Sequence, residues 1–547
     1  MGYALALGFV ASLILLFSTS SSFTTRSAFT PIESLGVLPI WPFSAAYIFF
    51  FSTGLLVALR TRSQVIRLLL VGAFASLVLG FWPIKSPLGM YESVPKLTNM
   101  NIILQTGHFE ASQGNYLDWP SLFILGSFFS EVAGFPSSVF LPAFLLVYSW
   151  IIGISFYAFS AKVIGPGFVS FLAASMAMGG NLIFATYSFH PEILGVVLVV
   201  LAVMMYLKPE AKRTGVFVIT AILGAALIAE SFTGATVLFF FLLLLPLRNK
   251  IRNGTFAPVR PFLLFTIMFT TWSLYWAVVA STNVISLILP SLSNPLAGIF
   301  HVSALYQANI QEPLWAIWTH YFWLAFGVLI PLVIALVAVW RGPKTYTVPT
   351  LFMLASFLTA GVALLNNGTN YFAILLYGPV AGSILVLLLI RKRRFLLILF
   401  VLSLVAFSVP TFFVLGNRVD SGYVSAQEYT SAEFLAAFDH TAVVYNPSSY
   451  VTYLNSVVPT AGQPQLFTGA PGSGYATSQA EAVLLAYYNK YTLSGGVLQF
   501  AVANLENVYH LYGPVISSSI DSALLSSCRS EGIVYSNHQY IVCESNA

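Results

Sequence analysis

The sequence predicts a polytopic α-helical membrane protein with a polar C-terminal domain outside the membrane. Three observations predict this fold class: 58% of the 547 residues are hydrophobic, only 7% are charged, and apolar runs recur until residue 415. Each run is about 20 residues long, which is the length that a helix needs to cross a hydrocarbon core of about 30 Å. No soluble globular protein has this composition.

About 13 apolar segments are candidate spans. They are residues 3–22, 41–60, 66–84, 137–160, 164–180, 191–207, 214–229, 232–247, 261–281, 315–340, 346–366, 370–391 and 395–415. The first segment has no basic residue before it, which distinguishes it from a signal peptide, so we expect it to remain in the chain.

The basic residues predict an N-in/C-out orientation. With a cytoplasmic N-terminus, every inside loop is basic, as the positive-inside rule requires. Of the 18 Asp and Glu only Glu210 falls inside, and all 7 His fall outside. Of the 23 Lys and Arg only six fall outside: Arg26, Lys85, Lys96, Arg418, Lys490 and Arg529. The inside charges would lie against anionic lipid, so the net charge of +5 indicates no nucleic-acid partner.

Residues 416–547 are predicted to form an extracytoplasmic α/β domain, following the membrane domain of residues 1–415. Residues 431–440 and 478–492 have helical patterns, residues 441–446 read as a strand, and residues 532–544 read as a hairpin that turns at Asn537 and His538. The two cysteines, Cys528 and Cys543, are either a disulfide or two free thiols, and an oxidising exterior favours the disulfide. Closing this loop would stabilise the domain by about 3 kcal/mol.

The loops restrict where chemistry can occur. The longest inside loop, Arg248 to Arg260, is too short to be a nucleotide-binding domain, and the sequence lacks Walker A, GxGxxG, HExxH and CxxC motifs. A primary pump is therefore excluded. We expect any reaction to occur on the outer face or within the membrane, on a substrate delivered there, and a lipid-linked substrate meets that condition.

The outer loop 85–136 collects ionisable groups in a chain that has few of them. It contains "YES" around Glu92, then "ILQTGHF", then "YLDWPSLFILGSFFSEVAGFP", and later outer segments read "FHPEILG" and "IAESFTG". This order resembles the GT-C superfamily, membrane glycosyltransferases that take sugars from polyprenyl-phosphate carriers. The resemblance covers residues 66–415. Glu92 matches the family's acidic loop position, and Tyr116, Trp119 and Pro120 match the segment that leads into an amphipathic helix.

The resemblance implies a catalytic role for Glu92. Transfer from a phospholipid carrier has a good leaving group, so one carboxylate that takes the acceptor's proton suffices. Alternatively, Glu92 and Lys96 form a solvated i, i+4 pair. The family's late outer Arg is absent at Asn370 and Tyr371, and the "WWDYG" signature is absent too, which argues against transfer of a whole glycan to Asn. Donor phosphate contacts would then fall to Lys85, Lys96, His108, His190 or His301.

Three other acidic residues are candidates for donor or acceptor binding. Glu192 lies with His190 at a span start, Glu230 stands in an outer turn where the family often has His, and Asp118 precedes Trp119. Each also has an ordinary interpretation as a span cap, a solvated turn or a helix-positioning residue. A divalent cation held by Glu92 with Asp118 or His190 is compatible with these residue types, but no spacing requires it.

The sequence therefore favours a cell-membrane glycosyltransferase with its active side outside. Its partners would be a polyprenyl-phosphate sugar, membrane lipid and a glycan, protein or lipid acceptor. Two alternatives stay open: a transporter or flippase of a lipid-linked or small substrate, and an inactive GT-C-like assembly protein. A transporter is expected to show repeats and polar groups near the bilayer midplane, whereas this chain gathers its ionisable groups at outer span ends.

Overall fold

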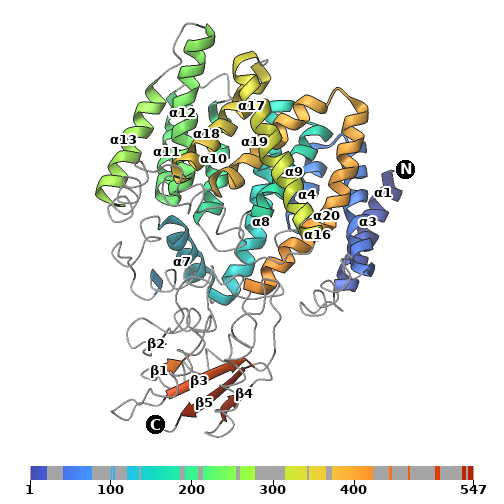
Figure 1. Cartoon of the computed structure of the whole chain (residues 1–547), viewed down its shortest axis with the longest axis vertical. Helices are drawn as coiled ribbons and strands as arrows, with labels where there is room; N and C mark the ends of the chain where they lie inside the picture. Colours follow the sequence, from blue (N-terminus) through green and yellow to red (C-terminus); the bar gives the residue numbers. More distant parts are fainter. Residues whose placement is uncertain are drawn as a thin grey trace.

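The computed structural model is a bundle of long helices with a small β-sheet beyond one end (Figure 1). It describes residues 2–20, 41–76, 100, 103–104, 107, 120–134, 137–184, 191–206, 214–253, 259–277, 314–341, 344–364, 372–422, 443–445, 466–467, 499–504, 533–536 and 540–545.

Apart from α7, which lies in the predicted outer loop 85–136, the helices fall within or close to the predicted apolar segments, and α16 and α17 share the segment 315–340. In chain order they are α1 (Gly2–Ser20), α3 (Trp41–Arg60), α4 (Gln64–Ala75), α7 (Ser121–Ala133), α8 (Ser137–Ile164), α9 (Phe168–Phe184), α10 (Pro191–Tyr206), α11 (Thr214–Glu230), α12 (Phe232–Asn253), α13 (Arg260–Tyr275), α16 (Leu314–Leu324), α17 (Ile330–Arg341), α18 (Thr347–Leu364), α19 (Phe372–Ile390) and α20 (Arg394–Gly422). Among the described residues, four stretches are long and apolar enough to cross a membrane: 143–164, 232–250, 321–340 and 394–411. The number of spans stays a prediction.

Three segments differ in detail from their predicted bounds. The span predicted at 315–340 is divided by a π-helical turn, η3 (Ala325–Leu329), where α19 comes so close that a Cβ on Gly382 would overlap the Gly327 carbonyl oxygen. Helix α13 ends at Tyr275, earlier than residue 281, and α20 continues to Gly422. A backbone approach this close requires glycine, and a π turn lets one helix bend around another.

The core of the bundle lies around α9, which packs against α4, α8 and α19. Small residues allow this approach: a Cβ on Gly179 would overlap the Trp323 ring. The indole Nε1–H of Trp323 donates to Thr411 Oγ1 at 2.8 Å and so links α16 to α20. Large apolar side chains on the outside of the bundle remain exposed, including Leu336, Val337 and Leu402, as expected for helices that face lipid.

The side chain of Arg67 donates hydrogen bonds to carbonyl oxygens at the C-terminal end of α3. The guanidinium of Arg67, in α4, donates from Nε to the Ala58 carbonyl oxygen at 3.2 Å and from Nη2 to the carbonyl oxygen of Thr61. These are carbonyls of the last turn of α3 and the residue after it, which have no partner within a helix. Arg67 thereby fixes the short α3–α4 connection.

The strands at the C-terminal end form one mixed sheet of order β2-β1-β3-β5-β4. The strands are β1 (Val443–Tyr445), β2 (Leu466–Phe467), β3 (Gln499–Asn504), β4 (Ile533–Ser536) and β5 (Tyr540–Ser545). β1 pairs in parallel with β2 and β3, and β5 pairs antiparallel with β3 and β4. β1 lies within the strand predicted at 441–446, and β4 and β5 pair as the two strands of the hairpin predicted at 532–544, whose turn at Asn537 and His538 lies outside the described residues. The helices predicted at 431–440 and 478–492 lie outside the described residues, so the α/β domain remains a prediction.

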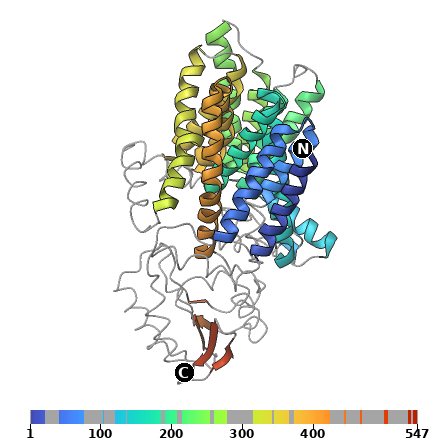
Figure 2. The same ribbon diagram turned by 90° about the vertical axis from the view of Figure 1, so that its right-hand side faces the viewer.

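The sheet lies beyond the end of the bundle where α7 is found, and the turn between α19 and α20 lies at the opposite end (Figures 1 and 2). We call the first end the Glu192 end, because α10 begins there and α11 ends there. At the other end Arg391 Nη1 donates to the Ile164 carbonyl oxygen at 3.5 Å. The cationic run 391–394 therefore lies far from the carboxylates described next.

Candidate functional site

Glu192 stands in the first turn of α10, immediately after Pro191 at the start of the helix. Proline is favoured at this position because its fixed φ suits the first turn and its missing N–H needs no partner. A carboxylate in the first turn is stabilised by the unpaired N–H groups and the positive end of the helix dipole. The sequence "HPE" thus both starts the helix and places an acidic side chain at its end.

Two hydroxyls at the turn between α11 and α12 donate hydrogen bonds to the Glu192 carboxylate. Ser231 Oγ donates to Glu192 Oε2, and Thr233 Oγ1 donates to Glu192 Oε1 at 2.8 Å. Ser231 Oγ also accepts the Gly234 N–H at 2.9 Å, so it caps the N-terminus of α12. One serine therefore ends the turn between α11 and α12 and ties it to α10.

Two tyrosines pack around this contact. Tyr148 Oη, on α8, donates to the Ile193 carbonyl oxygen at 2.6 Å. Tyr377, on α19, is fully buried, and two glycines make room for its hydroxyl: a Cβ on Gly195 or Gly234 would lie 3.2 or 2.8 Å from it. Five helices (α8, α10, α11, α12 and α19) thus meet at one polar point.

Glu230, the last residue of α11, is 0% exposed and lies near enough to Glu192 for the two carboxyl groups to interact electrostatically. Neither of its carboxyl oxygens has a hydrogen bond of normal geometry within the described part of the chain. A buried polar group without partners is costly and needs an explanation. The Glu230 carboxyl is therefore the least satisfied group in this cluster.

The structure brings together two of the predicted site residues, Glu192 and Glu230. They are 38 positions apart in the sequence, and each lies at the outer end of a predicted span. The other candidates lie outside the described residues: Glu92, Lys85, Lys96, His108, Asp118, His190, His301 and Cys528. Cys543 lies in β5, opposite Ala501 and Ile533, and its pairing with Cys528 stays a prediction.

Sequence reasoning missed Ser231, Thr233, Tyr148 and Tyr377. The "ES" and "TG" of the outer turn offered a signal for the first two, because Ser before a helix predicts an N-cap. No local pattern marks the two tyrosines, since a buried aromatic residue is ordinary in any span. Within the described ranges, no three His, Cys, Asp or Glu side chains gather as a metal site.

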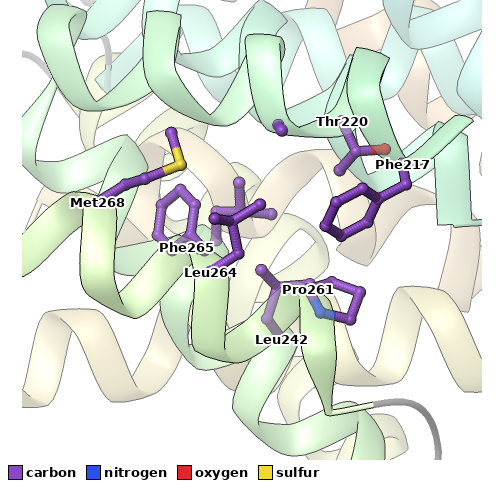
Figure 3. A pocket seen from close by; sticks show the side chains of 9 residues that line it. Phe217, Thr220, Leu242, Pro261, Leu264, Phe265 and Met268 are labelled. Carbon is purple, nitrogen blue, oxygen red and sulfur yellow. The ribbon is translucent and has the colours of Figure 1, made fainter. Parts of the chain in front are cut away.

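A separate small pocket lies among α11, α12 and α13, away from this cluster. Figure 3 shows Phe217, Leu242, Pro261, Phe265 and Met268 around it, with the Thr220 hydroxyl as its polar group. Phe217 and Pro261 belong to the first turns of α11 and α13, whereas Glu230 ends α11. None of the described side chains that line the pocket is ionisable.

Comparison with known proteins gives matches in structure only. No protein-family model and no curated protein sequence matches the chain. The oligosaccharyltransferase of Archaeoglobus fulgidus, tethered to an acceptor peptide with the NVT sequon, matches at a TM-score of 0.51 with 12% identity, over 88% of this chain and 74% of that one.

Two further solved structures are similar. The archaeal oligosaccharyltransferase AglB from A. fulgidus, in complex with an inhibitory peptide and a dolichol-phosphate, matches with the same TM-score, identity and coverage. ArnT from Cupriavidus metallidurans, bound to undecaprenyl phosphate, matches at 0.46 with 13% identity, over 86% of this chain and 97% of that one. The likeness to the two A. fulgidus structures shows that this chain shares their fold, in agreement with the resemblance drawn from the sequence.

Proposed function

We propose that this chain is a membrane glycosyltransferase that moves a sugar from a polyprenyl-phosphate donor to an acceptor on the outer face. The observation that carries the proposal is the pair of a half-buried carboxylate, Glu192, and a buried one, Glu230, set beside the helix that follows the "YLDWP" segment, in a fold similar to that of AglB. AglB has been solved with a dolichol-phosphate, which supports a polyprenyl-phosphate carrier for this chain.

The proposed step needs one base and a good leaving group. The Glu92 carboxylate takes the proton of the acceptor's nucleophilic group as that group attacks C1 of the sugar. The bond between C1 and the phosphate oxygen breaks, and polyprenyl phosphate leaves with the electron pair. Cationic side chains at Lys85, Lys96, His108, His190 or His301 would balance the phosphate charge, and Asp118 would position the helix that follows it.

The orientation belongs to the same proposal. The Glu192 end of the bundle would face outward, because the run 391–394 lies at the opposite end and basic residues favour the cytoplasm. The C-terminal strands would then lie outside the membrane, beside the site, where an acceptor is recognised. A divalent cation stays open, with Glu92, Asp118 and His190 as its candidate ligands.

The test is transfer by purified protein in lipid nanodiscs, supplied with a panel of polyprenyl-phosphate sugars. We expect the parent to transfer or hydrolyse one of them, and Glu92→Gln to lose about 10²–10⁴-fold in rate, the usual effect of removing a general base. Glu110→Gln, in the same loop, is the matched control and should keep its activity. EDTA treatment followed by Mn²⁺ or Mg²⁺ decides whether a cation takes part.

Three outcomes would contradict the proposal at different levels. Parental activity in Glu92→Gln would remove Glu92 as the base. An inactive parent that moves a fluorescent lipid-linked sugar between leaflets would replace the transferase by a flippase. An inactive parent that does neither would support the assembly protein.

A further inference from the structure

The least satisfied group of the cluster, the Glu230 carboxyl, lies beside the beginning of α7. Helix α7 starts after Pro120, and the proline side chain at this N-cap position accepts no hydrogen bond from the first turn. The first N–H groups of any helix have no partner within the helix and need an acceptor. Glu230 therefore has acceptor oxygens that lack a donor among the described residues, and the first turn of α7 has N–H groups that need an acceptor.

Two observations join these groups. Ser121 Oγ, in the first residue of α7, donates to the Ala229 carbonyl oxygen at 3.1 Å, next to Glu230 in the chain. The backbone N–H of Leu122 interacts with the Glu230 carboxyl, although this contact does not reach the geometry of a full hydrogen bond.

Helix α7 connects the bundle with the loop that carries Glu92. On one side it packs against α8, α10 and α11. On the other, Ser127 Oγ donates to the Met100 carbonyl oxygen at 2.9 Å. Met100 follows Glu92 in the same outer loop. A shift of α7 would therefore disturb its contact with Met100, which follows Glu92 by eight residues in the sequence.

We propose that Glu230, from α11, is the N-terminal cap of α7 and thereby a positioning residue for the loop that carries Glu92. Its importance to transfer rests on the proposed function, whereas the capping itself can be measured without any reaction. The essential property of the side chain is its acceptor oxygen, not its volume. Gln keeps an acceptor and the shape, whereas Met keeps a similar volume and deletes the acceptor.

The experiment measures how fast a buried thiol on α7 reacts. In a Cys528→Ser/Cys543→Ser background, Ser127→Cys places a near-isosteric thiol at a position that is buried at 4% exposure. A methanethiosulfonate reagent labels this thiol only when α7 leaves the bundle. Ser383→Cys, buried on α19 at 0% exposure, reports opening of the whole bundle in the same way.

We expect Glu230→Met to label Ser127→Cys about tenfold faster than the parent, the usual effect of losing one helix N-cap acceptor. Glu230→Gln should stay within about threefold, because it keeps that acceptor. Glu131→Gln, an exposed carboxyl on α7 itself, is the matched control and should change nothing. The Ser383→Cys rate should stay constant in all variants.

Equal labelling of Ser127→Cys in Glu230→Met and the parent would overturn the capping role. Faster labelling at Ser383→Cys would overturn it too, because the whole bundle would then have loosened. If the parent transfers sugar, Glu230→Met should lower kcat about tenfold with little change in donor KM, and Glu230→Gln should restore it. A parent that shows no transfer refutes the proposed function, and the labelling rates then decide by themselves whether Glu230 caps α7.

Discussion

Gly195→Ala tests the close packing that holds the carboxylate cluster together. Gly195 lies in α10, where an alanine normally stabilises a helix by about 0.5–1 kcal/mol relative to glycine. Here the added Cβ would lie 2.7 Å from Ser231 Cβ and 2.9 Å from Ser231 Oγ. Real Cβ atoms do not approach other heavy atoms this closely, so Ser231 has to move.

The expected cost follows from that movement. Overpacking of this kind costs about 1–3 kcal/mol. If Ser231 turns away, its hydrogen bond to the Glu192 carboxylate is lost as well, and a hydrogen bond to a charged group contributes about 1.5–3 kcal/mol. With both costs and after subtraction of the helix gain, we expect Gly195→Ala to destabilise the protein by about 1.5–5.5 kcal/mol.

The assay is thermal unfolding in detergent at one fixed heating rate, followed by tryptophan fluorescence. Gly361→Ala is the matched control, because Gly361 lies inside α18 and a Cβ there meets no atom within 4 Å. It should unfold at or above the midpoint of the parent, and Gly195→Ala clearly below it. Equal midpoints for the two alanine variants would refute the packing argument, since Ser231 would then be free to rearrange.

Three further outcomes are expected. Tyr148→Phe should lower the unfolding midpoint by the equivalent of about 1 kcal/mol, because it deletes a buried hydrogen bond of 2.6 Å; Tyr157→Phe, whose buried hydroxyl has no hydrogen-bond partner within the described residues, should leave it unchanged or raise it. Thr411→Val should cost about 1–3 kcal/mol in the same assay, because the Trp323 N–H would lose its acceptor, and an unchanged midpoint would show that this bond contributes nothing. In a cysteine-free background, Asn253→Cys should resist a membrane-impermeant thiol reagent applied to intact cells, and rapid labelling would reverse the proposed orientation.

Much of the helical framework could be read from the sequence because its signal is local. Lipid requires long apolar helices, and a run of apolar residues reveals one wherever it occurs. The predicted segment 41–60 is the helix Trp41–Arg60, and the helix predicted at 191–207 is Pro191–Tyr206. The hairpin at 532–544 was equally readable from its alternating strands. The interruption at Ala325–Leu329 was not, because it depends on the approach of α19.

The positions of Glu192 and Glu230 at helix ends could likewise be predicted from the sequence, since one precedes and the other follows an apolar run. Their surroundings could not, because these depend on the tertiary packing. That packing turns the Ser231 and Thr233 hydroxyls toward Glu192, and it buries Glu230 beside the start of α7. Helix ends far apart in the sequence meet only when glycines and other small residues let their helices pack closely, and no local pattern encodes which ends will meet.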